Sequence, residues 1–160
     1  MKPEILTQKN FSPFGDVIEP NEQGSHYRIN EGYTERYHDL AQLDLNQNQG
    51  RPLVNIFRST PKALPITIET MESHPLSSQA FIPLSHQPYL VVVAPKGDFQ
   101  ESKIKVFLAS PTQGVNYHRG VWHHYSLALN EVSDFVVIDR GGEGENCNEV
   151  ALQKPLEISL

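Results

Sequence analysis

The chain has 160 residues and a formal net charge of −6 at pH 7. For this length a single domain covering residues 1–160 is the simplest expectation. The acidic balance argues against a nucleic-acid-binding protein, which would carry a basic face, and against binding to anionic membranes.

Signals for the cellular compartment are few. Cys147 is the only cysteine, so no disulfide can form within the chain, and a reducing compartment is expected. The N-terminal residues lack the apolar run of a signal peptide, and the longest apolar run, 89–95, is too short to span a bilayer. We therefore expect a cytoplasmic protein with no membrane partner.

The first element expected in chain order is a short helix at residues 8–11. Thr7 is a suitable N-cap, and Pro13 and Gly15 follow where the helix would end. All later signals favour β-strands, because short runs rich in β-branched and aromatic residues alternate with Pro, Gly, Ser and Asn. The expected strands span residues 53–58, 66–71, 80–84, 89–94, 104–109, 124–129 and 135–139.

The connections favour an all-β fold. The stretch 43–52 is rich in Asn, Gln and Gly and is expected to form a loop between two strands. No long stripe with a 3.6-residue period occurs, so the crossover helices of a doubly wound α/β fold are missing. The pattern favours a sandwich or a small barrel. Small barrels hold ligands inside or at the mouth, so inward-facing polar residues are the ones to consider.

Two segments, 69–84 and 114–124, carry most of the histidine. Neither contains His-Glu-x-x-His or paired cysteines. Both instead resemble the two motifs of the cupin superfamily. In the second segment Gly120 and His123 match the Gly and His of the second motif, and in the first segment His74 matches the second histidine of the first motif.

This chain departs from the cupin pattern at several positions. Gln79 stands where the first motif has Glu, and Glu72 stands where it has its first His. Glu72 and His74 are two residues apart and share a strand face, and His123 from a later strand would close a site. Such mixed nitrogen and oxygen ligands suit divalent Ni, Mn, Fe or Zn. Alternatively, His74 and Gln79 are hydrogen-bonded barrel residues.

Four segments together resemble a narrower family: "ERYHDL" (35–40), "HPLSSQAFIPL" (74–84), "GVNYHRGVWHH" (114–124) and "DFVVIDRGG" (134–142). In this order and spacing they are similar to the ureidoglycolate lyase family, once called ureidoglycolate hydrolases, and the similarity runs almost end to end. The resemblance implies a mainly β chain, a cupin-type antiparallel β-barrel (jelly-roll-like) with a few short helices, commonly a homodimer.

The resemblance also implies an activity and a cofactor. The family cleaves (S)-ureidoglycolate to glyoxylate and urea, a late step in using the nitrogen of allantoin, a product of purine breakdown. A divalent metal, often given as nickel, is associated with it. A base must take the hydroxyl proton and an acid must protonate the departing nitrogen, and histidine suits both tasks.

We expect His118 to be the main acid–base residue. A regular strand would place His118 on the same face as Asn116, with Tyr117 on the opposite face. His123 and the adjacent His124 also point to opposite faces, so His124 is expected on the outside or at a dimer interface.

The segment "RYHDL" adds Tyr37 and His38 as further catalytic candidates. In this segment Asp39 could orient a histidine, or the segment could reach across a dimer. A capped turn before a strand is the alternative interpretation.

An arginine is expected to bind the substrate carboxylate, because its fork pairs two oxygens at once. Arg58 ends an apolar strand and is the first choice for substrate binding, together with Asn116. Arg140 could instead pair structurally with an acid. The remaining candidates are Arg28, Arg36 and Arg119.

Two other functions stay open on the sequence. One is a different cupin enzyme, such as a metal-dependent isomerase or a dioxygenase acting on a small acid. The other is a non-catalytic cupin that binds a small carboxylate.

Overall fold

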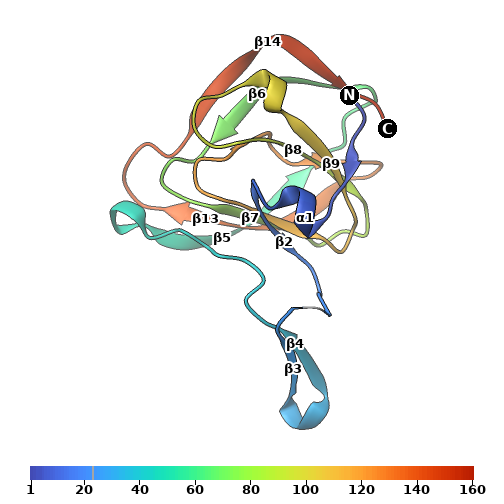
Figure 1. Cartoon of the computed structure of the whole chain (residues 1–160), viewed down its shortest axis with the longest axis vertical. Helices are drawn as coiled ribbons and strands as arrows, with labels where there is room; N and C mark the ends of the chain where they lie inside the picture. Colours follow the sequence, from blue (N-terminus) through green and yellow to red (C-terminus); the bar gives the residue numbers. More distant parts are fainter. Residues whose placement is uncertain (23) are drawn as a thin grey trace.

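The computed structural model describes residues 1–22 and 24–160. Two large β-sheets form the body of the molecule, and a small two-stranded sheet projects from it (Figure 1). The first sheet has seven strands in the order β1, β9, β8, β11, β6 and β14, with β12 paired to β8. These strands are β1 (Glu4–Ile5), β6 (Ile66–Ser73), β8 (Tyr89–Ala94), β9 (Lys105–Ala109), β11 (Trp122–His123), β12 (Leu127–Ala128) and β14 (Asn148–Ile158).

The second sheet has five strands in the order β2, β10, β7, β13 and β5. They are β2 (Gly15–Ile18), β5 (Arg51–Ser59), β7 (Gln79–Pro83), β10 (Gly114–Tyr117) and β13 (Ser133–Gly141). The projecting hairpin pairs β3 (His26–Ile29) with β4 (Thr34–Tyr37). The helical segments are α1 (Gln8–Phe11), η1 (Asn30–Gly32), η2 (Gln47–Gln49) and η3 (Glu101–Lys103). None of the described helices is long and apolar enough to cross a membrane.

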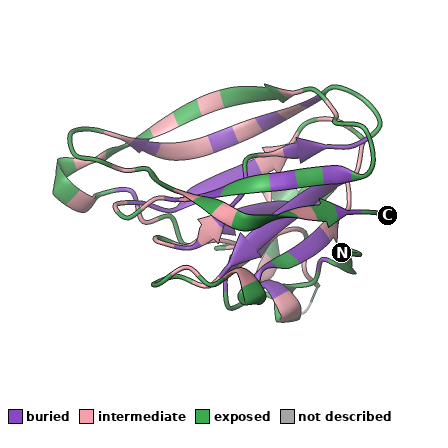
Figure 2. Cartoon of the chain, turned by 90° about the horizontal axis from the view of Figure 1, so that it is seen from above, coloured by how far each residue is buried: buried purple, intermediate pink, exposed green. Residues whose placement is uncertain are grey.

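The core lies mainly between the two large sheets, where Phe81, Tyr117 and Phe135 of one sheet meet Val91 and Phe107 of the other. Strand β8 is buried at every position, because its alternate residues enter two different clusters. One face of β8 belongs to this inter-sheet core, and the opposite face packs with β6 and β14 in a second cluster. Buried positions accordingly gather on the central strands, and exposed positions lie on the outer edges and loops (Figure 2).

The local predictions are largely confirmed. Helix α1 is capped by Thr7, whose hydroxyl accepts from the Asn10 N–H while the Asn10 side chain accepts from the Thr7 N–H. Six of the expected strands correspond to β5, β6, β7, β8, β9 and β13. Of the expected strand 124–129, only Leu127–Ala128 is paired.

The mainly β fold with a few short helices is confirmed, as two sheets packed face to face in a cupin-like sandwich. Across the described part of the chain, no strand pair joins the two large sheets, so they do not close by hydrogen bonds into one barrel. Strand β14 was not predicted. Its apolar residues Val150, Ala151 and Leu152 are consecutive, and Lys154 and Pro155 follow where the pairing with β6 shifts register.

Candidate metal and active site

Four residues predicted as metal ligands converge at one end of the space between the sheets. Glu72 is on β6, His74 follows directly after β6, His123 is on β11 and Gln79 begins β7 in the opposite sheet. The Nε2 atom of His123 lies 3.2 Å from Gln79 Oε1 and 3.5 Å from Glu72 Oε1. The rings of His74 and His123 are 5.0 Å apart between centroids. One ligand atom from each of Glu72, His74 and His123 lies within 4.8 Å of the others.

The hydrogen bond of His74 leaves its Nε2 atom for a ligand, whereas the Nε2 atom of His123 faces oxygen atoms of Gln79 and Glu72. His74 Nδ1 donates to the Asn146 carbonyl at 2.6 Å, and His123 Nδ1 donates to the Val121 carbonyl at 3.1 Å. This is how proteins orient metal-binding histidines, because the donated N–H fixes the other nitrogen as a lone pair. The Nε2 atom of His74 is buried and has no hydrogen-bond partner. The donor set therefore fits a divalent cation held by two nitrogens and two oxygens.

The electrostatics of the cluster agree with this assignment. The hydrogen bond with His123 lowers the pKa of Glu72, which keeps that carboxylate ionised. Burial, followed by the neighbouring His123, lowers the pKa of His74, which keeps that imidazole neutral. An ionised carboxylate at Glu72 and a neutral imidazole at His74 are the protonation states that a metal ligand requires.

Tyr117 forms the wall of the cluster on the side of β10. Its ring stacks on His123, with centroids 4.3 Å apart and planes inclined by 13°. Burial raises the pKa of the Tyr117 hydroxyl, so it stays protonated. The contact fixes the plane of the His123 ring.

A cavity of about 310 Å³ opens beside His74 and Gln79. Asp139, on β13, lines it too, although the sequence interpretation did not single it out. Its carboxylate accepts from Asn55 Nδ2 at 3.0 Å and is hydrogen-bonded with the Gln79 side chain. Burial raises the Asp139 pKa. The signal for Asp139 was its spacing from Phe135 and Val137, which lie in the inter-sheet core. The remaining lining residues are Ser77, Arg140, Gly144, Glu145, Asn146 and Cys147.

His118 and Asn116 lie away from this cluster. Asn116 lies on β10 and His118 directly follows it, and both contact the same Asp16 oxygen, at 3.1 Å from His118 Nε2 and 2.9 Å from Asn116 Nδ2. On β10, however, Tyr117 is the residue whose side chain points into the space between the sheets. The expectation that His118 points toward the ligand site inside the fold is therefore wrong for the metal cluster.

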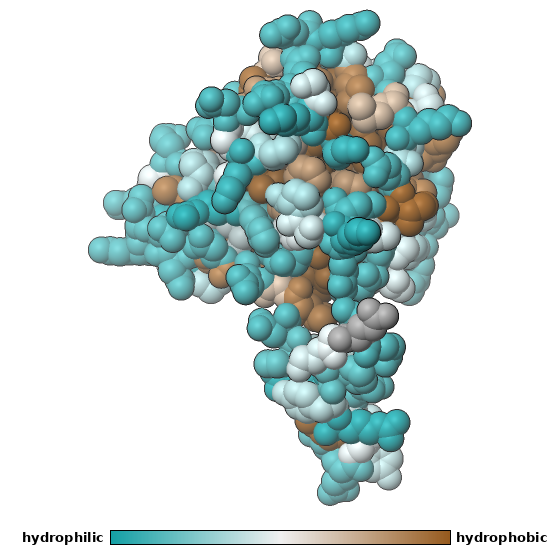
Figure 3. Space-filling view, in the orientation of Figure 1, coloured by the Kyte–Doolittle hydropathy of each residue, from teal (hydrophilic) through white to brown (hydrophobic). Residues whose placement is uncertain are grey.

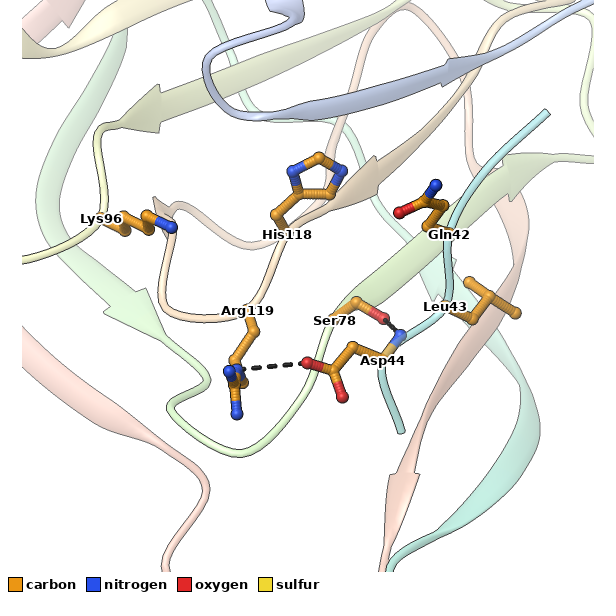
Figure 4. Close-up of a pocket in the computed structure, with 7 residues that line it drawn as sticks. All are labelled: Gln42, Leu43, Asp44, Ser78, Lys96, His118 and Arg119. Carbon is orange, nitrogen blue, oxygen red and sulfur yellow. Dashed lines mark hydrogen bonds and ion pairs between the residues drawn. The ribbon is translucent and has the colours of Figure 1, made fainter. Parts of the chain in front are cut away.

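His118 instead lines a separate surface cavity of about 430 Å³ with Lys96 and Arg119 (Figure 4). There the Arg119 Nε atom is 3.2 Å from Asp44 Oδ2. The His118 side chain is 44% exposed.

Arg58 does not face the substrate cavity. It pairs with Asp134 across β5 and β13, with Nε and Nη2 each 2.8 Å from a carboxylate oxygen. Its side chain is 71% exposed, because Arg58 shares the outer face of β5 with Val54 and Ile56. The structure thus places Arg58, predicted to bind substrate, on the outside of the sheet with its fork paired to Asp134.

Tyr37 ends β4 of the projecting hairpin (Figure 1), and His38 follows it and lines a cavity with Asp16 of β2. The Tyr37 hydroxyl donates to Glu22 Oε1 at 2.5 Å, and this bond is the main reason that its pKa is raised to about 12. The backbone N–H of His38 donates to the Ser25 carbonyl. The hairpin surface is mostly hydrophilic, whereas hydrophobic residues gather on the body (Figure 3).

His124 points away from His123, as expected for adjacent strand residues. It is buried rather than open to the outside, and burial lowers its pKa to about 4. With Glu72 and Tyr125 it lines a small cavity on the outer side of the cluster.

Comparison with known proteins agrees with the sequence resemblance. The family model for ureidoglycolate lyase matches residues 1–159. A protein of Burkholderia mallei (strain NCTC 10229) named ureidoglycolate lyase is 55% identical over 156 residues, covering 98% of this chain and 91% of that protein. A protein of Pseudomonas syringae pv. syringae (strain B728a), also named ureidoglycolate lyase, is 49% identical over 147 residues, covering 91% of this chain and 86% of that protein.

A third similar protein, from Chelativorans sp. (strain BNC1), carries the same name. It is 45% identical over 157 residues, covering 98% of this chain and 94% of that protein. Both the family model and these relatives span nearly the whole chain, including every segment that builds the cluster. The chain therefore belongs to the ureidoglycolate lyase family.

Proposed function

We propose that this protein is a ureidoglycolate lyase that cleaves (S)-ureidoglycolate to glyoxylate and urea. Family membership supports the reaction class. The observation that supports the location is the buried, unpartnered Nε2 of His74, which lies with Glu72 and His123 beside a cavity. The cavity is of a size suited to a small acid.

Glu72, His74, Gln79 and His123 would hold a divalent cation, and nickel is the first candidate through the family resemblance. When bound, such a cation polarises oxygen atoms of the substrate and orients it. Gln79 contributes a neutral oxygen where a carboxylate would add charge. Because the Gln79 amide also contacts Asp139, it connects the ligand set to the cavity.

The reaction itself needs one proton to move. The reacting carbon of ureidoglycolate carries a hydroxyl, a ureido nitrogen and a carboxylate. Loss of the hydroxyl proton forms the C=O bond of glyoxylate as the C–N bond breaks, and a proton on the departing nitrogen completes urea. No water is consumed, so atoms balance between one substrate and two products.

We assign this proton transfer to Asp139 rather than to His118. Asp139 lines the cavity beside His74 and Gln79, and its raised pKa makes its carboxylate a better base for the hydroxyl proton, which it then passes to the leaving nitrogen. The amides of Asn55 and Gln79 hold its carboxylate in position. His118 directly follows β10, and its Nε2 contacts Asp16 Oδ2 at 3.1 Å, away from the cavity beside His74.

We further propose that the protein acts as a homodimer in the cytoplasm, in the use of allantoin-derived nitrogen. The outer face of β5 exposes Val54 (74%) and Ile56 (57%), which a second copy would cover. Neither Tyr37 nor His38 lines the cavity beside His74, so we assign them to the dimer. The exposed, unpaired Cys147 suits a reducing compartment.

The test is product analysis with purified protein and (S)-ureidoglycolate, with and without added nickel or manganese. We expect glyoxylate and urea in equal amounts. Ammonia and carbon dioxide in place of urea would indicate a hydrolase. Oxygen uptake with another small acid would favour the dioxygenase alternative, and carboxylate binding without turnover under any metal condition would favour a non-catalytic protein.

A further inference from the structure

Arg140 carries a buried positive charge without a negative partner. The residue is 8% exposed, and no carboxylate among residues 1–22 and 24–160 forms an ion pair with it. Its Nε donates to the Gln47 carbonyl at 3.0 Å, and its Nη2 donates to the carbonyls of Asn48 at 3.3 Å and Glu143 at 2.8 Å. Carbonyl dipoles satisfy these N–H groups but supply no opposite charge.

A buried guanidinium of this kind is costly unless a counter-charge is present. The adjacent Asp139 does not supply it. Both residues line the cavity, but the Asp139 carboxylate is engaged by the amides of Asn55 and Gln79 rather than by Arg140. Among residues 1–22 and 24–160 these carbonyl contacts use Nε and Nη2 and none uses Nη1, whose two N–H groups can donate to a ligand.

The guanidinium is also held rigidly. A Cβ at Gly50 would collide with Arg140 Nε, and a Cβ at Gly142 would lie 3.3 Å from Nη2. Gly142 has a φ of +134°, a conformation that favours glycine. Two loops therefore pack against the arginine from both sides. Its side chain has little conformational entropy left to lose when a ligand binds.

Arg140 lines the same cavity of about 310 Å³ as His74 and Gln79. An anion bound to Nη1 would thus lie in the space next to the candidate metal ligands. We propose that Arg140 binds the carboxylate of the substrate, so that the cavity selects small 2-hydroxy acids over their neutral analogues. This inference rests on the proposed function, and it gives Arg140 the role that the sequence suggested for Arg58.

The test compares Arg140→Gln with wild type and with Arg58→Gln, a matched loss of one arginine outside the cavity. Binding of glycolate and of its neutral analogue glycolamide is measured by calorimetry, and KM and kcat are measured with (S)-ureidoglycolate. We expect Arg140→Gln to weaken glycolate binding and raise KM by roughly 10- to 100-fold, as for the loss of a charged hydrogen bond. Glycolamide binding and kcat should change far less, and Arg58→Gln should match wild type.

Each outcome separates a binding role from a structural one. Equal losses for glycolate and glycolamide would mean that Arg140 only secures the loops at Gln47 and Glu143, and would overturn the inference. So would an unchanged KM in an active Arg140→Gln enzyme. If that variant does not fold, the Nη resonances of Arg140 in the wild-type protein are followed by NMR during glycolate titration, and no shift would count against binding. Absence of turnover in wild type would instead reject the proposed function.

Discussion

His123 lies directly opposite Glu72 in the pairing of β11 with β6, and its Nε2 is 3.5 Å from a Glu72 carboxylate oxygen. The same nitrogen faces Gln79 Oε1 from the other sheet. A single imidazole nitrogen is thus surrounded by oxygen acceptors, an arrangement that a cation between them satisfies. Strand pairing therefore builds the candidate metal site, and residues far apart in sequence meet because their strands are neighbours.

Replacing His123 should abolish tight metal binding. His123→Ala removes a nitrogen ligand, so nickel should dialyse away from the variant but stay with wild type, as measured by metal analysis. His118→Ala serves as the control, because its ring binds Asp16 on the other face of β10. Equal nickel content in His123→Ala and wild type would reject the cluster as the metal site.

Asp139→Asn should lower kcat by roughly 10²- to 10⁴-fold, as is usual for the loss of an acid–base group. An amide keeps the shape of the carboxylate but cannot carry the proton. Steady-state kinetics and metal content are measured together, so that a loss of rate is not confused with a loss of metal. We expect His118→Ala to stay within a few-fold of wild type. A large fall in kcat for His118→Ala with full activity for Asp139→Asn would reverse the assignment.

The pair of Arg58 and Asp134 should show in the acid titration of the protein. The hydrogen bond from Arg58 lowers the Asp134 pKa below its ordinary value of 3.8. Since the folded pKa lies below the unfolded one, the stabilisation is present above the unfolded pKa and is lost as pH falls through the folded pKa. Arg58→Gln should return the Asp134 pKa toward 3.8, as followed by carboxyl NMR, with little change in stability at neutral pH because the pair is exposed.

Ile56→Lys should dissociate the proposed homodimer. A charged side chain on the aliphatic outer face of β5 cannot be buried against a second copy without a partner. Sedimentation velocity of the variant should give a monomer where wild type gives a dimer. Val132→Lys, at another exposed aliphatic position, is the control and should stay dimeric. A dimer that persists in Ile56→Lys would place the interface elsewhere.

Local signals in the sequence predicted much of the fold. The Thr7 cap and six strands depend on neighbouring residues alone, through side-chain hydrogen bonding and a two-residue period. Strand β14 was not predicted, because its pairing with distant β6 tolerates charged residues and a register shift near Pro155. The hairpin of β3 and β4 was not predicted either, because its polar strands are little buried and lack an alternation of apolar and polar residues.

In the candidate site, too, some features follow from the sequence and others only from the tertiary structure. The resemblance of two short segments to the cupin motifs predicted that Glu72, His74, Gln79 and His123 would converge, and the structure brings their side chains together. Period-two alternation also showed that Tyr117 and His118 lie on opposite faces of β10. Which of these faces points inward depends on the strands on either side, and only the packing of Tyr117 on His123 decided it.

The tertiary structure likewise decided the roles of the arginines. Arg58 and Arg140 both lie at strand ends, and nothing local distinguishes them. Arg58 meets Asp134 across a strand pair, whereas Arg140 is enclosed by two loops that bring carbonyls and no carboxylate. Alternation, capping and family motifs are properties of the sequence by itself. The inward face of a strand and the partner of a charge are set by residues distant in the chain, and only the folded structure brings them into contact.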